Sequence, residues 1–235
     1  MSGVEGEGQY REQEAPPLRK AIARRMTESK LSIPHFYLTV DVEAEKLVEF
    51  RTALNAGRET RISYNDIILK AVAQVLLAHP ECNVSYHDGK MRYYAEADLC
   101  LAVAVRGGLL TPVVRSCGQK SIAEISGEAG ALVAKARGKR LRPGESMGGS
   151  FTLSNLGMYG IEHFAAIINP PQALILAVGT IRETAVVKNG NLAIGMRMKM
   201  TLSCDHRAVD GTTAAVFLAE LKALLEDPAR IESGR

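Results

Sequence analysis

The sequence has no tryptophan, which by itself excludes no class of fold, and it has no long apolar run. Its most apolar stretches, residues 67–78 and 173–178, fall short of the roughly 20 residues that a membrane-spanning helix needs. The N-terminal residues also lack the basic and then apolar pattern of a secretory signal. We therefore expect no membrane partner and an intracellular location, either cytoplasmic or organellar after loss of a transit peptide.

Cysteine and excess charge are also scarce. The four cysteines, Cys82, Cys100, Cys117 and Cys204, form no Cys-x-x-Cys pair and do not have the spacing of metal ligands. We expect them to be buried, reduced thiols, and we expect no metal. The formal net charge is only +3, and no basic run is interleaved with aromatic residues as in an RNA-binding face. We therefore expect no nucleic-acid partner.

Apolar residues make up 46% of the chain, which is enough to build a core. Residues 1–17 are rich in glycine, glutamate and glutamine, which predicts a flexible linker or a remnant of cloning. Residues 18–235 contain neither a repeat nor a second linker, so we expect one domain. Helical and strand periodicities alternate along it, which favours an α/β fold with a mixed sheet and helices on one side.

Periodicity, caps and turn residues divide the domain into elements. Ser63-x-x-Asp66 and Ser121-x-x-Glu124 are capping boxes that open helices, and Asn189-Gly190 predicts a hairpin turn. Helices are expected at residues 18–31, 47–54, 63–79, 121–138 and 211–227. Strands are expected at residues 36–42, 99–105, 109–114, 173–178, 181–187 and 192–203. Residues 148–157 are expected to be a strand that runs into a glycine-flanked turn.

Residues 201–211 stand out because a strand pattern enters them and a helix pattern leaves them. His206 is therefore expected on a strand-to-helix turn, where a rigid scaffold can present a reactive group. Asp210 is expected at the start of the helix, where a carboxylate meets the positive end of the helix dipole. Taken alone, a histidine near two aspartates is more often structural than catalytic.

The residue pattern in this stretch resembles two nested signatures. His206-x-x-x-Asp210-Gly211 resembles that of chloramphenicol-acetyltransferase-like acyltransferases. The longer Asp205-His206-Arg207-x-x-Asp210-Gly211 resembles the catalytic core of the dihydrolipoamide acyltransferases, the E2 components of 2-oxo acid dehydrogenase complexes. Residues 17–26 with 33–35, residues 151–157 and residues 168–173 resemble other segments of that core, in the same order. The resemblance spans residues 18–230 and implies a chloramphenicol-acetyltransferase-like two-layer sandwich.

Residues 154–160 and 202–207 are most similar to pyruvate-type members of this family. The resemblance therefore implies transfer of an acetyl group between dihydrolipoamide and coenzyme A, with both as substrates, in the core of a pyruvate dehydrogenase complex. A succinyl or branched-chain acyltransferase, or an assembly scaffold with little activity, is left open. The complexes of this family work in the bacterial cytoplasm or the mitochondrial matrix.

By the same resemblance, His206 is the general base that takes the proton from the attacking thiol. Ser154 is the donor to the oxyanion, although the sequence alone favours a serine that bonds its own backbone in a glycine-bounded turn. Asp210 completes the site, with Arg25 as its expected partner, or else acts only on the helix dipole. Supporting roles fall to Asp205 and Arg207, which shape the turn, and to Asn155, a turn residue.

Coenzyme A carries phosphates, and the sequence has no phosphate-binding loop. A basic cluster at a helix end is a candidate for binding the phosphates, although a solvated surface that suits a helix C-terminus is the commoner role. The cluster comprises Lys135, Arg137, Lys139 and Arg140. Cys204, two residues before His206, offers an alternative as a covalent nucleophile. A buried, inert cysteine is commoner at the end of a strand.

The resemblance also implies partners. Family members are homotrimers in which the histidine of one subunit faces the serine of the next, and trimers join into cages through an apolar C-terminal tail. Only Ile231 is aliphatic in the tail of this chain, so we expect it to dock into a neighbouring trimer. No lipoyl-type Asp-Lys-Ala turn precedes residue 18, so lipoyl domains, and through missing domains the E1 and E3 components, are expected as separate partners.

Overall fold

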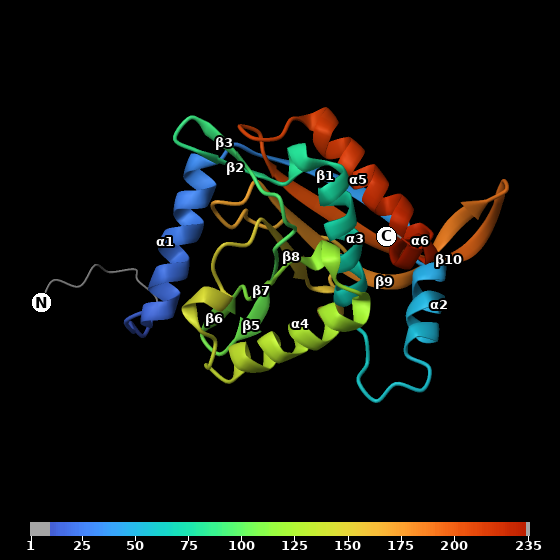
Figure 1. Cartoon of the computed structure of the whole chain (residues 1–235), viewed down its shortest axis with the longest axis horizontal. Helices are drawn as coiled ribbons and strands as arrows, with labels where there is room; N and C mark the ends of the chain where they lie inside the picture. Colours follow the sequence, from blue (N-terminus) through green and yellow to red (C-terminus); the bar gives the residue numbers. More distant parts are fainter. Residues whose placement is uncertain (1–9, 234–235) are drawn as a thin grey trace, which may run out of the picture.

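A six-stranded mixed sheet in the order β1-β10-β9-β8-β4-β7 forms one layer of the fold (Figure 1). The structure is a computed structural model and describes residues 10–233. β8 runs parallel to β9 and to β4, and the other neighbours in this sheet are antiparallel. The strands are β1 (His35–Glu43), β4 (Leu99–Leu101), β7 (Val113–Val114), β8 (Phe151–Asn155), β9 (Leu174–Lys188) and β10 (Asn191–Asp205).

Two short hairpins stand beside this sheet, β2 (Val84–His87) with β3 (Lys90–Tyr93), and β5 (Val103–Val105) with β6 (Gly108–Leu110). The helices are α1 (Pro17–Ser32), α2 (Glu45–Leu54), α3 (Tyr64–Ala78), α4 (Ile122–Arg137), α5 (Gly211–Glu226) and α6 (Ala229–Ser233).

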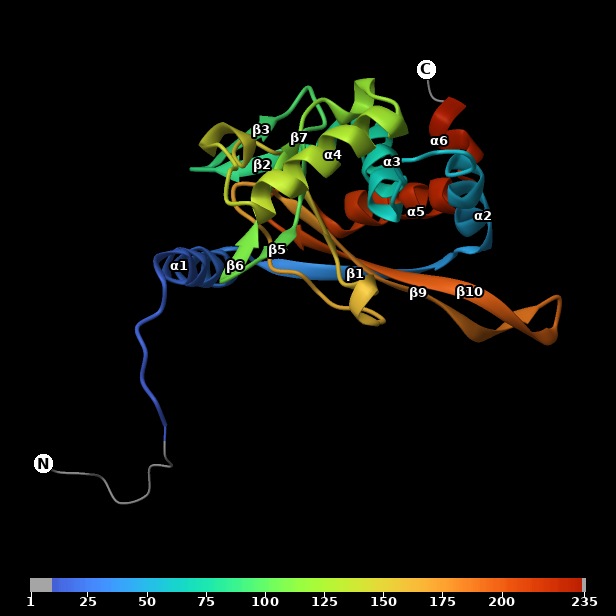
Figure 2. The ribbon, with the colours of Figure 1, turned by 90° about the horizontal axis from the view of Figure 1, so that it is seen from below.

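The helices α2 to α6 lie over one face of the sheet, which confirms the predicted α/β arrangement (Figure 2). α1 is the exception, because it lies at the margin of the sheet, where the side chains of Leu18 and Ile22 pack against Gly108 of β6. The core fills the space between the sheet and the covering helices, and its largest buried side chains include Phe151, Leu153 and Phe217.

The local signals in the sequence have the predicted structural effects. The Ser63 hydroxyl accepts a hydrogen bond from the Asp66 N–H, and the Asp66 carboxylate accepts one from the Ser63 N–H, so the capping box is complete at the start of α3. The second box, Ser121 with Glu124, opens α4 in the same way. Asn189 has a φ of 52° and joins β9 to β10 in the predicted hairpin.

Some predicted strand boundaries are wrong. The strands expected at residues 173–178 and 181–187 are one continuous strand, β9, and the strand expected at 99–105 is split into β4 and β5. Within β9, Gly179 lies where a larger residue would not fit. A Cβ atom at this position would lie 1.9 Å from the Glu162 carbonyl oxygen, so the neighbouring backbone passes directly over the strand.

The expected role of Ile231 as an intertrimer knob is also wrong for this chain. Residues 229–233 form the short helix α6, which the sequence analysis missed, and the Ile231 side chain is fully buried in the chain's own core. A side chain that already fills this core is not exposed for docking. The isoleucine thus contributes about 1.5–3 kcal/mol to the fold of its own subunit.

The predicted N-terminal linker falls partly outside the described residues, because residues 1–9 lie beyond them. Residues 10–16 have no regular secondary structure, and α1 begins at Pro17. Within residues 10–233, no helix combines the length and apolar character needed to cross a membrane.

Candidate active site

His206 lies where the sequence predicts, on the turn between β10 and α5, and its side chain is exposed in the single chain. Its N–H donates to the Pro34 carbonyl at 3.1 Å, which fixes the turn to the chain just before β1. Its ring lies 4.7 Å from the ring of Phe36 on β1. An exposed imidazole held by its backbone and by one ring neighbour can meet a group brought from outside the chain.

Asp205 and Arg207 flank this histidine and shape its turn, as expected. The buried Asp205 carboxylate accepts from the Arg207 backbone N–H at 3.0 Å and from the guanidinium Nη2 at 2.8 Å. The Arg207 guanidinium also lies over the ring of Tyr86, 4.8 Å from its centre. The hydrogen bond with Asp205 raises the pKa of Arg207, so its guanidinium remains charged.

The expected pairing of Arg25 with Asp210 is wrong within this chain. Asp210 caps α5, because its carboxylate accepts from the Thr213 N–H at 2.8 Å. The hydrogen bonds with Thr213 lower the pKa of Asp210. Arg25 instead donates to the Pro170 carbonyl. The carboxylate thus follows the alternative reading, an acid at a helix N-terminus.

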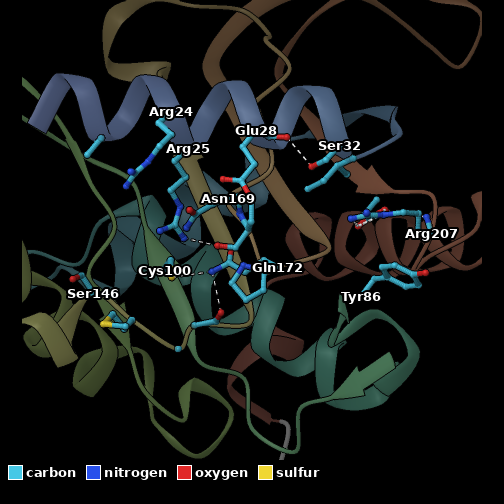
Figure 3. Close-up of a pocket in the computed structure, with 18 residues that line it drawn as sticks. Arg24, Arg25, Glu28, Ser32, Tyr86, Cys100, Ser146, Asn169, Gln172 and Arg207 are labelled. Carbon is cyan, nitrogen blue, oxygen red and sulfur yellow. Dashed lines mark hydrogen bonds and ion pairs between the residues drawn. The ribbon is translucent and has the colours of Figure 1, made fainter. Parts of the chain in front are cut away.

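A cavity of about 600 Å³ with several charged residues in its lining lies between α1 and the loops at residues 146–149 and 169–172 (Figure 3). Arg25, Asp205 and Arg207 all line it, so the structure brings these three predicted residues together. Gln172 forms its floor, where the side-chain N–H groups donate to the Gly149 carbonyl at 3.0 Å and to the Cys100 sulfur at 3.1 Å.

Ser154 is on β8, one residue before its end, and not in the glycine-bounded turn that the sequence favours. Within the described residues, its hydroxyl has no hydrogen-bond partner. Two cavities adjoin at this serine, and Ala102 and Leu109 also line both of them. A hydroxyl at such a junction can donate to an oxygen that approaches from either side.

The two cavities at Ser154 differ in character. The first, about 330 Å³, is polar at its margin, where Arg61 and Arg137 lie, together with the start of α3. The second, about 220 Å³, is smaller and mostly apolar, and its lining includes Met26, Ile167 and Ile175. Asn155 holds the chain beside them, because its side chain donates to the Asn65 side chain at 2.7 Å and accepts from the Gly157 N–H at 2.7 Å.

The predicted basic cluster does not act as a unit. Lys135 forms an ion pair with Glu145, Lys139 occupies a left-handed turn position with a φ of 55°, and Arg140 lies beside Gly138. Only Arg137 of the four lines the Ser154 cavity. Arg61 was missed, although its position two residues before the cap of α3 places a cation at a helix entrance that the sequence does identify.

Cys204 does not have the environment of a nucleophile, so that alternative is wrong. Its side chain is fully buried, and burial raises the pKa of its thiol to about 12. A thiol of this kind stays protonated at neutral pH, whereas the thiolate is the reactive form. Among residues 10–233, no group of three or more histidine, cysteine, aspartate or glutamate side chains could hold a metal ion.

His206 and Ser154 of one chain are far apart. Ser154 is level with Ala177 on β9, and Ala177 is level with Thr201 on β10, two strands from β8. His206 follows Thr201 by five positions, just past the end of β10. Strand spacing and rise place the two Cα atoms roughly 15–20 Å apart, far beyond hydrogen-bond reach.

Comparisons with known proteins identify relatives of this chain. The chain is 46% identical over 216 residues to the acetyltransferase component of the pyruvate dehydrogenase complex of Rickettsia bellii; that alignment covers 90% of this chain and 52% of that protein. The chain thus spans about half the length of the curated relatives it matches.

Two solved structures are also similar. One is of Azotobacter vinelandii dihydrolipoamide acetyltransferase, studied for the role of a serine, a histidine and an asparagine in its catalytic mechanism; the TM-score is 0.92 at 29% identity, over 98% of both chains. The other is the cubic core of a pyruvate dehydrogenase multienzyme complex, with a TM-score of 0.92, 30% identity and the same coverage.

A chloramphenicol acetyltransferase, 18% identical with a TM-score of 0.56, shares the fold, as the sequence predicts. The profile of a single family, described as "2-oxoacid dehydrogenases acyltransferase (catalytic domain)", matches residues 7–232, nearly the whole chain. The chain belongs to the catalytic domains of the 2-oxo acid dehydrogenase acyltransferases.

Proposed function

We propose that this chain transfers an acetyl group between dihydrolipoamide and coenzyme A, with His206 as general base and Ser154 as oxyanion donor. One correspondence carries the proposal. In the Azotobacter vinelandii protein, the serine precedes the histidine by as many positions as Ser154 precedes His206, and the asparagine follows the histidine by four positions, where this chain has Asp210.

In the reaction we propose, the coenzyme A sulfur attacks the carbonyl carbon of acetyl-dihydrolipoamide. A neutral His206 imidazole accepts the thiol proton as the new carbon–sulfur bond forms. The carbonyl oxygen becomes an oxyanion, to which the Ser154 hydroxyl donates. The bond to the dihydrolipoamide sulfur then breaks, and the imidazolium returns its proton to that sulfur. The reverse reaction uses the same groups in the opposite order.

The two cavities at Ser154 suit the two ends of this reaction. Arg61 and Arg137 provide two guanidinium groups to the lining of the larger of these cavities, where they could bind the phosphates of coenzyme A. The smaller apolar cavity beside Ser154 could hold the acetyl group. This assignment replaces the four-residue basic cluster with Arg137 and Arg61.

The separation of Ser154 from His206 supports a site shared between copies of the chain, and we propose a homotrimer that joins into a larger cage. This assembly is supported by exposed apolar side chains, because contacts between subunits usually cover such side chains. Val187, Leu192 and Ile194 share one face of the β9–β10 ribbon beyond the end of β1, and Met158 and Tyr159 lie after β8. Because Ile231 is buried, we assign no residue to the contacts that join the trimers.

The other parts of the proposal concern partners and location. Lipoyl domains would bring the dihydrolipoamide, and E1 and E3 components would act in the same complex. That complex would be in a bacterial cytoplasm or a mitochondrial matrix.

The test is acetyl transfer from acetyl-CoA to free dihydrolipoamide, followed by mass spectrometry of the acetylated product. We expect turnover by the wild type and its loss in His206→Ala, whose exposed side chain can be removed without harm to the fold. His163→Ala, which alters another exposed histidine, serves as the control. A folded His206→Ala variant that keeps more than about a tenth of the activity would rule out general-base catalysis by this residue.

A panel of acyl donors tests the acyl group. Acetyl-CoA should have a higher kcat/KM than succinyl-CoA or branched-chain acyl-CoA, because residues 154–160 resemble those of the acetyl-transferring members. A higher value for succinyl-CoA would favour the succinyl alternative. A wild-type protein that assembles but transfers none of these groups would favour a scaffold.

A further inference from the structure

The loop at residues 166–170 has no regular secondary structure, yet side chains from three elements hold its backbone. The Ser203 hydroxyl on β10 donates to the Ala166 carbonyl at 2.7 Å. The buried Ser29 hydroxyl on α1 donates to the Ile168 carbonyl at 2.7 Å. Arg25 on α1 donates to the Pro170 carbonyl (Figure 3). These three contacts all satisfy carbonyl groups of the loop.

His35, the first residue of β1, makes the one contact of this set that satisfies an N–H of the loop. Its Nε2 atom accepts from the Ile168 N–H at 3.1 Å, and its Nδ1 atom lies 2.9 Å from the Ile33 carbonyl oxygen. An acceptor nitrogen carries no proton, and a nitrogen that faces a carbonyl must carry one. These partners therefore fix one neutral tautomer of the imidazole, with the proton on Nδ1.

The loop that His35 holds forms a wall of the apolar cavity beside Ser154. Ala166, Ile167 and Asn169 line this cavity together with Ser154. Between them, Ile168 turns away from the cavity and is fully buried against Ile33 and Ile175. The hydrogen bond from the Ile168 N–H to His35 is thus one of four side-chain contacts that hold this wall.

The same strand supports the histidine of the candidate site. Phe36, next to His35, packs against the ring of His206, and Pro34, on its other side, accepts from the His206 N–H. His35 itself is level with Asp205 in the β1–β10 register. It therefore joins the support of the His206 turn to the wall of the Ser154 cavity.

We propose that His35 is a positioning residue for acetyl transfer. Through the acceptor at Nε2 it holds the 166–170 loop at the distance from β8 that suits an acyl group beside Ser154. This role rests on the proposed function, and it assigns His35 no contact with substrate. If the acceptor is lost, the buried Ile168 N–H is left unsatisfied, and the loop moves to reach water or another partner.

Two amide replacements separate the two ring nitrogens. The side-chain oxygen of His35→Gln can reach the place of Nε2 and accept from Ile168, whereas that of His35→Asn reaches only the place of Nδ1. Both variants lose the ring and its packing. We expect His35→Asn to lower kcat/KM for acetyl transfer about tenfold or more, and His35→Gln to stay within about threefold of the wild type.

Hydrogen exchange of the peptide that contains Ile168 gives a second readout, independent of activity. This peptide should exchange faster in His35→Asn and be protected in His35→Gln and in the wild type. His163→Gln, an exposed histidine in the preceding segment, is the matched control and should change neither readout.

Three outcomes would overturn the role of His35: wild-type kinetics in His35→Asn, equal loss of activity in both variants, or a protected loop in His35→Asn. A wild-type protein without acetyl transfer would instead contradict the proposed function. Hydrogen exchange would then decide whether His35 holds the loop.

Discussion

The Nε2 atom of His79 lies 2.6 Å from a carboxylate oxygen of Glu220, which joins the C-terminal end of α3 to the middle of α5. The Nδ1 atom faces Glu81 at 3.2 Å, so both ring nitrogens have acidic partners. The hydrogen bond with Glu220 raises the pKa of His79 above its ordinary value of 6.5, with a smaller contribution from Glu81. The link between the two helices is therefore strongest when this histidine is protonated.

Stability should depend on pH through this histidine. Because the pKa is raised in the folded state, the stabilisation is complete below about pH 6.5 and is lost as pH rises through the folded pKa. The midpoint temperature of thermal unfolding should be lower for His79→Gln than for the wild type at pH 6, and the two should be nearly equal at pH 9. His163→Gln is the control and should show no such convergence. An equal difference at both values would contradict the assignment.

Mixing two inactive variants tests the shared site. His206→Ala supplies an intact Ser154, and Ser154→Ala supplies an intact His206. The two variants are mixed in equal amounts, unfolded and refolded together. Randomly assembled trimers should regain about a quarter of the wild-type activity, because about a quarter of the subunit boundaries then pair an intact His206 with an intact Ser154. Each variant refolded alone is the control. A mixture no more active than its components would mean that the two residues do not meet across a boundary.

Ser154→Ala should lower kcat about 10²–10³-fold with little change in KM, because an oxyanion donor acts mainly in the transition state. Steady-state kinetics with acetyl-CoA and dihydrolipoamide measure both constants. Ser126→Ala is the matched control, because Ser126 on α4 lines the larger of the two cavities that adjoin at Ser154. If KM rises and kcat stays constant, Ser154 binds substrate instead.

Ile231→Asp should destabilise each subunit. The substitution leaves a cavity and buries a charge, so we expect the free energy of unfolding to fall by about 3 kcal/mol or more in denaturant titration. Ala229→Asp puts the same charge on an exposed position of α6 and should have little effect. A variant of wild-type stability that assembled only to trimers would restore the docking role that the burial of Ile231 contradicts.

Elements with local signals could be predicted from the sequence. The capping boxes at Ser63 and Ser121 and the Asn189-Gly190 turn depend on hydrogen bonds and φ angles within a few residues, so their sequences suffice. The position of His206 followed in the same way, because strand and helix periodicities meet at one turn. The order of the strands, β1-β10-β9-β8-β4-β7, was not predicted, because no local pattern specifies which strands pair.

Contacts between distant segments could not be predicted. Arg25 reaches Pro170 across 145 positions, and nothing in its spacing distinguishes that carbonyl from the Asp210 carboxylate. A lone isoleucine in a polar tail fits the core of its own subunit as well as that of a neighbour, so Ile231 was assigned wrongly. The cavities at Ser154 are lined from many segments, which explains why Arg61 was missed.

The burial of all four cysteines, Cys82, Cys100, Cys117 and Cys204, has a practical consequence. Reagents that give a coloured product with free thiols react with the coenzyme A and dihydrolipoamide in an assay. They should not react with the buried cysteines of the folded protein. Conversely, protein that does react has opened, so slow labelling in the absence of substrate measures the rate at which molecules leave the native state.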